Sequence, residues 1–283
     1  MTKLLNGKIV ADDIFESLKS EINNLKTSGV SVKLAIIRAN SDGGSEYYKR
    51  SLIKKCDEVG IECEAIQLNE GTCTEREIID TVSVFTDKGY AILVLTPLPN
   101  NVCENAVFNA IDPNLDADCL SEVSLGKLLS KHSEIAPCTP KSVLKILDYY
   151  EFNLEGKNVC IVGRSNIVGK PLALLMTNRN ATVDLCHSKT AELAKHTKAA
   201  DIVVFATGSP ERFGREFVTE NSVVVDVGTT LNDEGKYVGD VRFDEMDGFV
   251  AALTPVRGGV GACTTACLLQ NVVKCCMLNS ACN

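Results

Sequence analysis

A glycine turn between Gly163 and Gly169 is the segment of the sequence best suited to bind a phosphorylated ligand. A β-branched apolar run ends at Gly163, and an apolar helical segment follows the turn. Backbone amides at a helix start can hold an anion, and glycine lets a pyrophosphate approach the backbone closely. The turn is a loose variant of GxGxxG, with Ser165 at the second glycine position and the last glycine one residue late. It indicates a dinucleotide site that uses Gly163, Arg164, Ser165 and Ile167.

The end of the next strand indicates which dinucleotide binds. Folds that take NAD place an acidic residue there, about 20 residues on, to bind the ribose 2′-hydroxyl. Here no carboxylate follows the strand, and Asp184 lies too early in it to reach the ribose. The Ser188 hydroxyl, Lys189 and Arg164 suit a 2′-phosphate instead. We therefore expect NADP. His187 has two interpretations, a cofactor contact and an ordinary surface histidine.

Elements that could position these residues follow from hydrophobic periodicity, beginning with the first half of the chain. Ile14, Leu18, Ile22 and Leu25 recur at the spacing of a helix that starts near residues 12–13. Strand-length apolar runs then alternate with amphipathic segments, which indicates βαβ units and a mostly parallel sheet covered on both faces. We expect strands at 32–40, 63–68 and 91–97, and helices at 45–59, 74–88 and 104–111.

The second half of the chain repeats the pattern. The segment 137–152 predicts a connecting helix capped by Thr139 and begun by Pro140. The fold class is therefore α/β, with two doubly wound parallel-sheet domains and a cleft between them, the second domain being of the Rossmann type. We expect one domain of residues 1–138 plus 260–283 and a dinucleotide-binding domain of residues 139–259. The expected elements are strands at 158–162, 181–186, 201–208 and 222–228, a helix entered through Pro171, and a C-terminal helix at about 264–277.

Composition excludes several classes of function. The 283 residues are 45% hydrophobic, which favours two folded domains over disorder. The formal net charge of −8 argues against nucleic-acid or anionic-membrane binding. We see no secretory signal and no apolar run of the roughly 18–20 residues that a membrane span needs, so we expect a soluble cytoplasmic protein. Thirteen cysteines without a CxxC pair favour reduced cytosolic thiols. The C-terminal cysteines at 263, 267, 275 and 276 lack metal-site spacing, and we expect no metal.

A series of motifs spans the chain: GSEYYKRSLIKKCDEVGI (44–61), LTPLPN (95–100), DPNLDADCL (112–120), PCTP (137–140), GRSNIVGKP (163–171), CHSKT (186–190), VVDVGTT (224–230), GDVRFDE (239–245) and TPVRGGVGACTTA (254–266). In this order they resemble the FolD family, methylenetetrahydrofolate dehydrogenase/methenyltetrahydrofolate cyclohydrolase, over essentially the whole length. The resemblance implies a folate-binding catalytic domain, an NADP-binding domain, a C-terminal helix that returns to the first domain, and a homodimer. It also implies that Thr229 contacts the cofactor.

The resemblance implies roles for five further residues. Tyr48 and Asp118 match the family's catalytic tyrosine and folate-contacting aspartate, and both would line the substrate pocket. Pro255, Gly258 and Gly259 match the family's substrate-binding glycine turn. The substrate would be a tetrahydrofolate derivative held between the two domains.

Three positions depart from the family pattern, one of them Arg257, which replaces the proline before the GGVG turn. Members usually carry a lysine four residues after the tyrosine and a glutamine just before the LPLP segment, but here Leu52 and Leu95 occupy these positions. Lys49 and Lys55 each lie about 60° from Leu52 around a helix, close enough for a long side chain to bend inward. An exposed, solvated helix face is the more ordinary setting for both lysines.

The chemistry of the two family reactions makes these departures informative. Hydride transfer from the methylene bridge of the folate to NADP depends mainly on proximity and orientation. Cyclohydrolysis needs water and proton transfer, which leucine cannot assist. We therefore expect an NADP-dependent methylenetetrahydrofolate dehydrogenase of one-carbon metabolism whose cyclohydrolase activity is weak or absent. Two alternatives stay open: a bifunctional enzyme that uses Lys49 or Lys55, and a repurposed homologue that binds a folate-like or other ligand.

Overall fold

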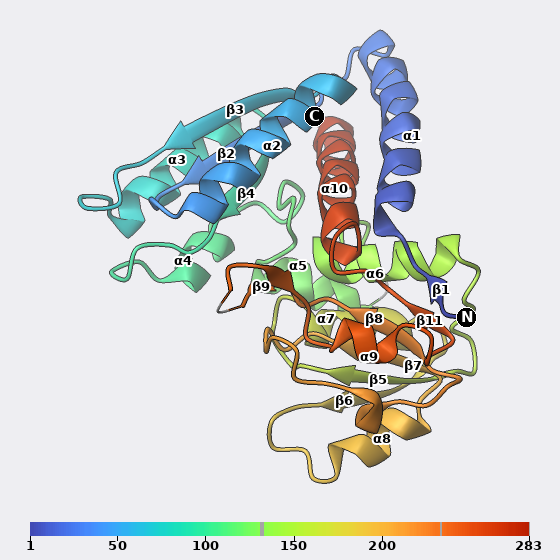
Figure 1. Cartoon of the computed structure of the whole chain (residues 1–283). Coiled ribbons are helices and arrows are strands. Elements are labelled where there is room, and N and C mark those ends of the chain that lie inside the picture. The colour runs from blue at the N-terminus through green and yellow to red at the C-terminus, as the bar shows by residue number, and fades with distance from the viewer. Residues whose placement is uncertain (131–132, 233, 283) are drawn as a thin grey trace. The chain divides into compact units, whose positions relative to one another are not determined.

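The computed structural model describes residues 1–130, 133–232 and 234–282, and the chain divides into two compact units (Figure 1). Unit 1 comprises residues 1–12 and 137–267, and unit 2 comprises residues 13–136 and 268 onward. The expected functional domains, 1–138 with 260–283 and 139–259, stay a prediction, because compactness by itself assigns no function to a unit.

Unit 1 contains a six-stranded sheet in which every neighbouring pair is parallel, in the order β1-β11-β8-β7-β5-β6. From β5 the chain crosses to β6 on one side of β5 in the sheet, and from β6 it crosses back to β7 on the other side of β5. Because such crossovers are right-handed, α7 and α8 cover opposite faces of the sheet (Figure 1). The elements are β1 (Lys3–Leu4), α6 (Cys138–Tyr149), β5 (Asn158–Val162), α7 (Gly169–Thr177), β6 (Thr182–Cys186), α8 (Leu193–Ala199), β7 (Ile202–Phe205), a 3₁₀ turn (Arg215–Phe217), β8 (Val223–Asp226), β9 (Thr230–Leu231), β10 (Tyr237–Val238), α9 (Phe243–Met246) and β11 (Ala252–Leu253).

The core of unit 1 explains why its central strands are continuous apolar runs. All four residues of β7 and all four of β8 are buried, as expected for parallel strands covered on both faces. Phe205 at the end of β7 stacks on Phe213 with ring centroids 4.5 Å apart. The buried core thus extends to the carboxyl ends of β5 and β7, and the predicted dinucleotide turn begins directly after β5.

Unit 2 contains a three-stranded parallel sheet in the order β3-β2-β4. Its crossovers also reverse direction, from β2 to β3 and then back past β2 to β4, so α2 and α3 cover opposite faces. The doubly wound fold expected for both halves is confirmed. The elements are β2 (Lys33–Arg38), α2 (Gly43–Val59), β3 (Glu62–Gln67), α3 (Glu75–Asp87), β4 (Ala91–Leu95), α4 (Glu104–Asn109), α5 (Glu122–Lys127) and a 3₁₀ turn (Leu128–Ser130). Helices α1 (Gly7–Thr27) and α10 (Val260–Cys282) contribute residues to both units.

Several expected boundaries are wrong. The connecting helix starts at Cys138 with Pro137 at the N-cap, two residues earlier than the expected start at Pro140 with the cap at Thr139. Helix α7 starts at Gly169, before Pro171. Helix α1 starts at Gly7 rather than near residues 12–13. Sequence periodicity also missed β1 and β11, because two-residue strands are too short to show a period.

Helix α10 corrects the expectation that no segment is long and apolar enough to span a membrane. Residues Val260–Ser280 meet that test by length and composition, with a mean hydropathy of 1.3. The core helix of a soluble protein passes the same test, and 61% of the tested window is buried inside the protein. Burial explains the composition of this helix without a membrane.

Candidate functional site

A cavity of about 270 Å³ lies at the carboxyl ends of β5, β6 and β7 in unit 1. The strand order reverses between β5 and β7, and open α/β sheets bind ligands at such a point. The structure brings Gly163, Arg164, Ser165, His187 and Ser188, all predicted to bind the cofactor, onto the wall of this one cavity. The lining residues are Val162, Gly163, Arg164, Ser165, His187, Ser188, Leu193, Ala206, Thr207, Ser209, Arg212 and Phe213.

Two glycines give the turn after β5 its shape. Gly163 has a φ of 130°, and a Cβ at this position would lie 2.2 Å from the carbonyl oxygen of Ala206. A Cβ on Gly169 would lie 1.9 Å from the carbonyl oxygen of Gly163. Ser165 closes the turn, since its Oγ accepts the N–H of Val168 at 3.1 Å. The turn therefore forms a cradle of bare backbone at the start of α7, which fits a pyrophosphate.

The cavity wall is cationic and rich in hydroxyl groups. Arg164 and Arg212 line it, and none of the described residues that line it is acidic. Asp184 on β6 instead lies beside α8, where its Oδ2 is 3.0 Å from Nδ1 of His196. A phosphate on the ribose would therefore meet arginine and hydroxyl groups rather than a carboxylate. Lys189, also expected near that phosphate, is not among the lining residues.

A local turn holds His187 on the cavity wall. Its backbone N–H donates to Oγ1 of Thr190 at 2.9 Å, and its Nδ1 accepts the N–H of Lys189 at 3.1 Å. Because Nδ1 is an acceptor, a neutral ring carries its proton on Nε2. His187 lines the cavity, and its role as a cofactor contact stays a prediction.

A buried carboxylate supports the loop after β7. Asp240 has no exposed surface. Its Oδ2 accepts the N–H of Gly208 at 3.2 Å, and both the N–H and the hydroxyl of Thr207, the latter at 3.0 Å. Its Oδ1 accepts the N–H of Ser209 at 2.8 Å. Thr207 and Ser209 line the cavity, so Asp240 fixes part of the cavity wall from behind.

A second buried carboxylate, Asp226, lies at the end of β8. Its Oδ1 accepts the N–H groups of Gly228 and Asp240 at 2.9 and 3.0 Å, and its Oδ2 accepts that of Val241 at 3.1 Å. Burial raises the pKa of Asp226 to about 7, against the opposing effect of these backbone hydrogen bonds. The two aspartates thus link β8 to the loop of the cofactor cavity through the backbone of residue 240.

The structure separates two predicted cofactor residues from the others. Ile167 and Thr229 are exposed and are not among the lining residues of the cavity, so their cofactor role stays a prediction. Sequence reasoning missed Thr207, Ser209 and Arg212, which line the cavity after β7. The signal was available, because the carboxyl ends of adjacent parallel strands meet at one edge of a sheet.

In unit 2 the corresponding reversal of strand order lies between β2 and β4. Asn40 follows β2, and its Nδ2 donates to the carbonyl oxygen of Pro97, which follows β4, at 2.8 Å. Tyr48 lies half-buried on α2, the helix that begins directly after this turn. Tyr48 is therefore carried by a helix that begins at the binding edge of the sheet.

Asp118 follows a segment that runs alongside β4. The N–H of Ile92 donates to the carbonyl oxygen of Leu115 at 2.7 Å, and the N–H of Ala117 donates to that of Ile92 at 3.2 Å. In this parallel register Asp118 lies toward the carboxyl end of β4, and its side chain is half-buried. The next residue, Cys119, has a φ of 58° and no exposed surface, so the backbone directly after Asp118 is strained.

Leu52 and Leu95 are core residues of unit 2, with 0% and 6% of their surface exposed. The expected exposed setting of Lys49 and Lys55 is wrong, since their side chains are only 15% and 35% exposed. Both are paired with carboxylates on their own helix. Nζ of Lys49 lies 2.7 Å from Glu46, and Nζ of Lys55 lies 2.7 Å from Glu58. Hydrogen bonds from these lysines lower the pKa of each glutamate, so both glutamates are ionised at neutral pH.

The predicted substrate turn 255–259 lies in unit 1 and packs against the start of α1. Gly258, at φ 77°, accepts the N–H of Lys8 at 3.0 Å through its carbonyl oxygen. A Cβ on Gly259 would lie 2.0 Å from the carbonyl oxygen of Pro255, so the turn requires glycine there. Tyr48 and Asp118 belong to unit 2, and the structure therefore places the predicted substrate residues in both units.

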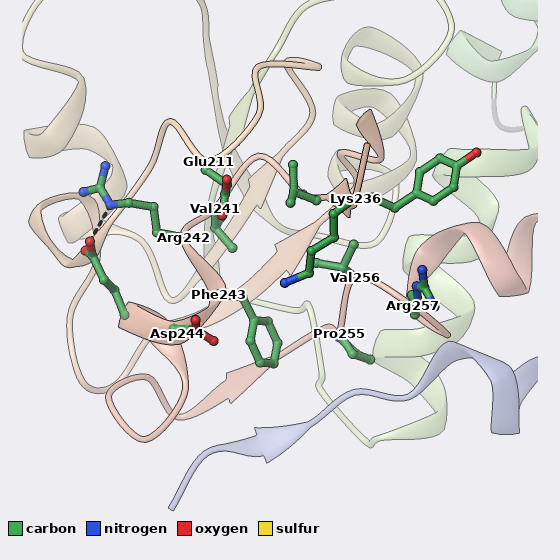
Figure 2. A pocket seen from close by; sticks show the side chains of 13 residues that line it. Glu211, Lys236, Val241, Arg242, Phe243, Asp244, Pro255, Val256 and Arg257 are labelled. Atoms are coloured by element: carbon green, nitrogen blue, oxygen red, sulfur yellow. Dashed lines mark hydrogen bonds and ion pairs between the residues drawn. The ribbon is translucent and has the colours of Figure 1, made fainter. Parts of the chain in front are cut away.

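A second cavity in unit 1, of about 520 Å³, includes Pro255 on its wall (Figure 2). Gly258 and Gly259 are not among its lining residues. Its charged wall is partly neutralised, since Arg242 pairs with Glu216 at 2.7 Å and with Glu245 at 2.6 Å. The lining residues are Glu211, Lys236, Tyr237, Val238, Gly239, Val241, Arg242, Phe243, Asp244, Glu245, Pro255, Val256 and Arg257.

The cysteines do not assemble a metal centre among the residues that the structure describes. No group of three or more histidine, cysteine, aspartate or glutamate residues is arranged to hold a metal ion in residues 1–130, 133–232 and 234–282. The described cysteines are free thiols, and most are buried. Cys160 and Cys186 lie on the paired strands β5 and β6 with their sulfur atoms 3.7 Å apart.

Comparison with known proteins identifies the family. The model of the tetrahydrofolate dehydrogenase/cyclohydrolase catalytic domain matches residues 5–118, and that of the NAD(P)-binding domain of the same family matches residues 137–280. The chain belongs to the tetrahydrofolate dehydrogenase/cyclohydrolase family. The resemblance and the fold class expected from the sequence are confirmed.

Individual members of the tetrahydrofolate dehydrogenase/cyclohydrolase family match along nearly their whole length. The bifunctional protein FolD of Clostridium perfringens is 44% identical over 275 residues, which cover 97% of this chain and 99% of that protein. The crystal structure of FolD from Campylobacter jejuni has a TM-score of 0.95 at 37% identity, covering 99% of this chain and 100% of that one. The Trypanosoma brucei enzyme, solved with NADP cofactor and inhibitor, has a TM-score of 0.92 at 31% identity, covering 99% and 98%.

Proposed function

We propose that this protein oxidises 5,10-methylenetetrahydrofolate to 5,10-methenyltetrahydrofolate with NADP, and that it has little or no cyclohydrolase activity. Membership of the family supports the substrate class and the oxidation. The arginine- and hydroxyl-lined cavity at the ends of β5, β6 and β7 supports NADP as the acceptor. The fully buried Leu52, at the position of the family's lysine, is the observation on which the loss of hydrolysis depends.

NADP, when bound, would supply the hydride acceptor, and the residues of the cavity wall would hold and orient it. The cradle at Gly163 and Gly169 would receive the pyrophosphate, and Arg164, Ser188 and Arg212, which line the same cavity, would bind the phosphates. The cation that develops on the folate is stabilised by its own two nitrogen atoms. The protein's contribution is then mainly proximity and orientation, which can be worth about 7–11 kcal/mol.

On the folate side, Asp118 would hydrogen-bond the pterin ring and Tyr48 would line the same pocket. Pro255, Gly258 and Gly259 would line the substrate site from unit 1. The support is the family match together with the placement of Tyr48 and Asp118 toward the binding edge of the unit 2 sheet.

Hydrolysis of the methenyl product makes a different demand. Water must attack the amidinium carbon, and protons must then move, so removing a general acid–base group typically costs about 10²–10⁴ in rate. Leu52 and Leu95 can neither accept nor donate a proton, and both are buried in the core of unit 2. Lys49 and Lys55 are held by Glu46 and Glu58 on α2, which argues against either as a substitute.

Restoring the family's two side chains tests the assignment. We expect Leu52→Lys with Leu95→Gln to raise methenyltetrahydrofolate hydrolysis more than either single change, because each polar group needs the other as a partner. Ser51→Lys, which adds a lysine to an exposed position of the same helix, is the matched control and should leave hydrolysis at the parent level. Hydrolysis that is fast in the parent and falls in Lys49→Ala or Lys55→Ala would instead establish a bifunctional enzyme. No oxidation of methylenetetrahydrofolate by the parent would establish a repurposed homologue.

We further propose that the protein acts in the cytoplasm as a homodimer, with residues 1–138 and 260–283 as the folate-binding domain and 139–259 as the NADP-binding domain. Reduced thiols and the family match support the compartment and the domain roles. Sedimentation of the purified protein at several concentrations tests the dimer.

A further inference from the structure

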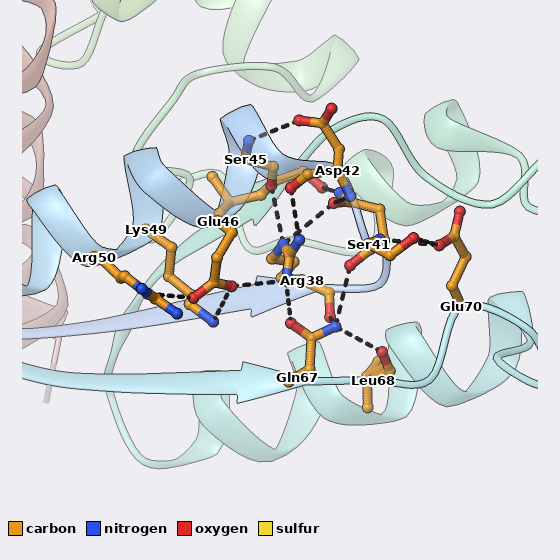
Figure 3. Close-up of polar contacts among 12 residues, drawn as sticks. Arg38, Ser41, Asp42, Ser45, Glu46, Lys49, Arg50, Gln67, Leu68 and Glu70 are labelled. Atoms are coloured by element: carbon orange, nitrogen blue, oxygen red, sulfur yellow. Dashed lines mark hydrogen bonds and ion pairs between the residues drawn. The ribbon is translucent and has the colours of Figure 1, made fainter.

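Arg38 is a buried arginine at the carboxyl end of β2, with 6% of its side chain exposed (Figure 3). All three guanidinium nitrogens donate hydrogen bonds. Nε donates to Oδ1 of Asn40 and to Oγ of Ser45, both at 3.2 Å. Nη1 donates to Glu46 at 2.8 Å and to Gln67 at 2.7 Å, and Nη2 donates to the carbonyl oxygen of residue 42 at 2.7 Å. A single side chain thus joins two strands, the turn after β2 and the first turn of α2.

The partners of Arg38 are themselves tied to the binding edge of unit 2. Asn40 donates to the carbonyl oxygen of Pro97 after β4, so the ends of β2 and β4 are linked. Asp42 caps α2, since its Oδ1 accepts the N–H of Ser45 at 2.7 Å. Arg38 therefore holds the turn 40–45 against the sheet, and the Asp42 cap holds it against the start of α2.

The charges of this network explain why arginine is needed. Glu46 accepts hydrogen bonds from Arg38 inside and Arg50 outside, and it pairs with Lys49. A buried guanidinium that lost its carboxylate would be strongly destabilising. Lysine could not replace it fully, because an ammonium is a compact point charge and cannot span acceptors on both sides of a planar group. Since guanidinium stays protonated, Arg38 cannot act as an acid or a base.

We propose that Arg38 is the positioning residue for Tyr48 in the folate site. Tyr48 lies two residues after Glu46 and three after Ser45, within the first turns of α2, so a shift of this helix start displaces the tyrosine directly. This inference rests on the proposed dehydrogenase function. Arg38 would therefore affect the folate pocket and not the cofactor cavity of unit 1, which is lined by none of these residues.

The test compares Arg38→Met with Arg50→Met in the full-length protein. Both variants remove a partner of the same carboxylate, but Arg50 is 77% exposed. With 5,10-methylenetetrahydrofolate as the varied substrate, we expect Arg38→Met to raise KM by about tenfold or more, because small misplacements at a substrate contact are costly. The KM for NADP should not change. Arg50→Met should leave both constants within about twofold, as for exposed ion pairs.

Two further variants separate positioning from stability. Arg38→Met with Glu46→Gln removes the buried guanidinium together with its half-buried carboxylate partner, and the folate KM should stay high in this variant if its thermal unfolding shows that it is folded. Arg38→Lys should fall between the parent and Arg38→Met in folate KM. A folate KM at the parent value in a folded double variant would overturn the inference and leave Arg38 a purely structural residue. Absence of dehydrogenase activity in the parent would refute the proposed function instead, so the two failures are distinct.

Discussion

Replacing Asp240 by asparagine tests how the cofactor cavity is built. The carboxylate of Asp240 accepts four hydrogen bonds from residues 207–209, and two of these three residues line the cavity. Asparagine keeps one oxygen, which can retain the group of donors now at Oδ2. Its NH₂ group would then face the N–H of Ser209 in place of Oδ1, which sets two donors against each other and leaves both unsatisfied.

The magnitude follows from that exchange. One hydrogen bond to a charged acceptor, worth about 1.5–3 kcal/mol, is lost, and the remaining ones lose their charge assistance. The loop is held in both the free and the cofactor-bound protein, so most of the loss should appear in the free energy of unfolding. We expect Asp240→Asn to lower it by about 2–3 kcal/mol. A remaining distortion worth about 1.4 kcal/mol at the cavity wall would weaken NADP binding about tenfold.

Urea unfolding and calorimetric titration with NADP measure the two effects. Asp244→Asn is the matched control, because this exposed aspartate lies four residues further along the chain and its substitution should change neither quantity. A folded Asp240→Asn protein with the parent's affinity for NADP would refute the reasoning that Asp240 shapes the cavity through the loop after β7.

Three further predictions concern the cofactor, the substrate and pH. Arg164→Ala should weaken NADP binding about tenfold more than NAD binding, since only NADP carries the 2′-phosphate; equal losses in titrations with both would contradict this. Asp118→Ala should weaken binding of methylenetetrahydrofolate about tenfold while NADP affinity stays the same, with the exposed Asp112→Ala as control. Because burial raises the pKa of Asp226 to about 7, the folded state favours the protonated acid. The free energy of unfolding should therefore fall by up to about 4 kcal/mol as pH rises from about 4 through 7, and urea unfolding of Asp226→Asn should lack this decline.

Much of the fold could be predicted from local sequence because its central strands are continuous apolar runs. The runs at 91–95 and 202–205 are fully buried, and such strands occur almost only in parallel sheets with helices on both faces. The dinucleotide turn could be found for the same reason, since the glycines at 163 and 169 mark an abrupt end to a buried strand. Strand β1 could not, because residues 3–4 pair with residues 252–253 at the other end of the chain.

The parts of the site that sequence reasoning missed are those made by contacts distant along the chain. Asp240 supports a loop 31–33 residues away, and nothing near it in the sequence indicates that partner. In the sequence, Arg38 is an unexpected charge in an apolar strand. Only the structure shows its partners, Glu46 and Gln67, which accept hydrogen bonds from its guanidinium group. By contrast, the sequence alone drew attention to Leu52 and Leu95, because the resemblance assigns each position a chemical role that leucine lacks. The structure shows both side chains buried.

The most direct test of the proposed function is to measure both reactions on one preparation of the unmodified protein. Reduction of NADP in the presence of 5,10-methylenetetrahydrofolate reports the oxidation, and decay of 5,10-methenyltetrahydrofolate, corrected for the spontaneous rate, reports the hydrolysis. Buried leucines at both polar positions predict clear NADP-dependent oxidation with hydrolysis little above the spontaneous rate. Hydrolysis at a rate comparable to oxidation would contradict the proposal that this member of the family is a dehydrogenase alone.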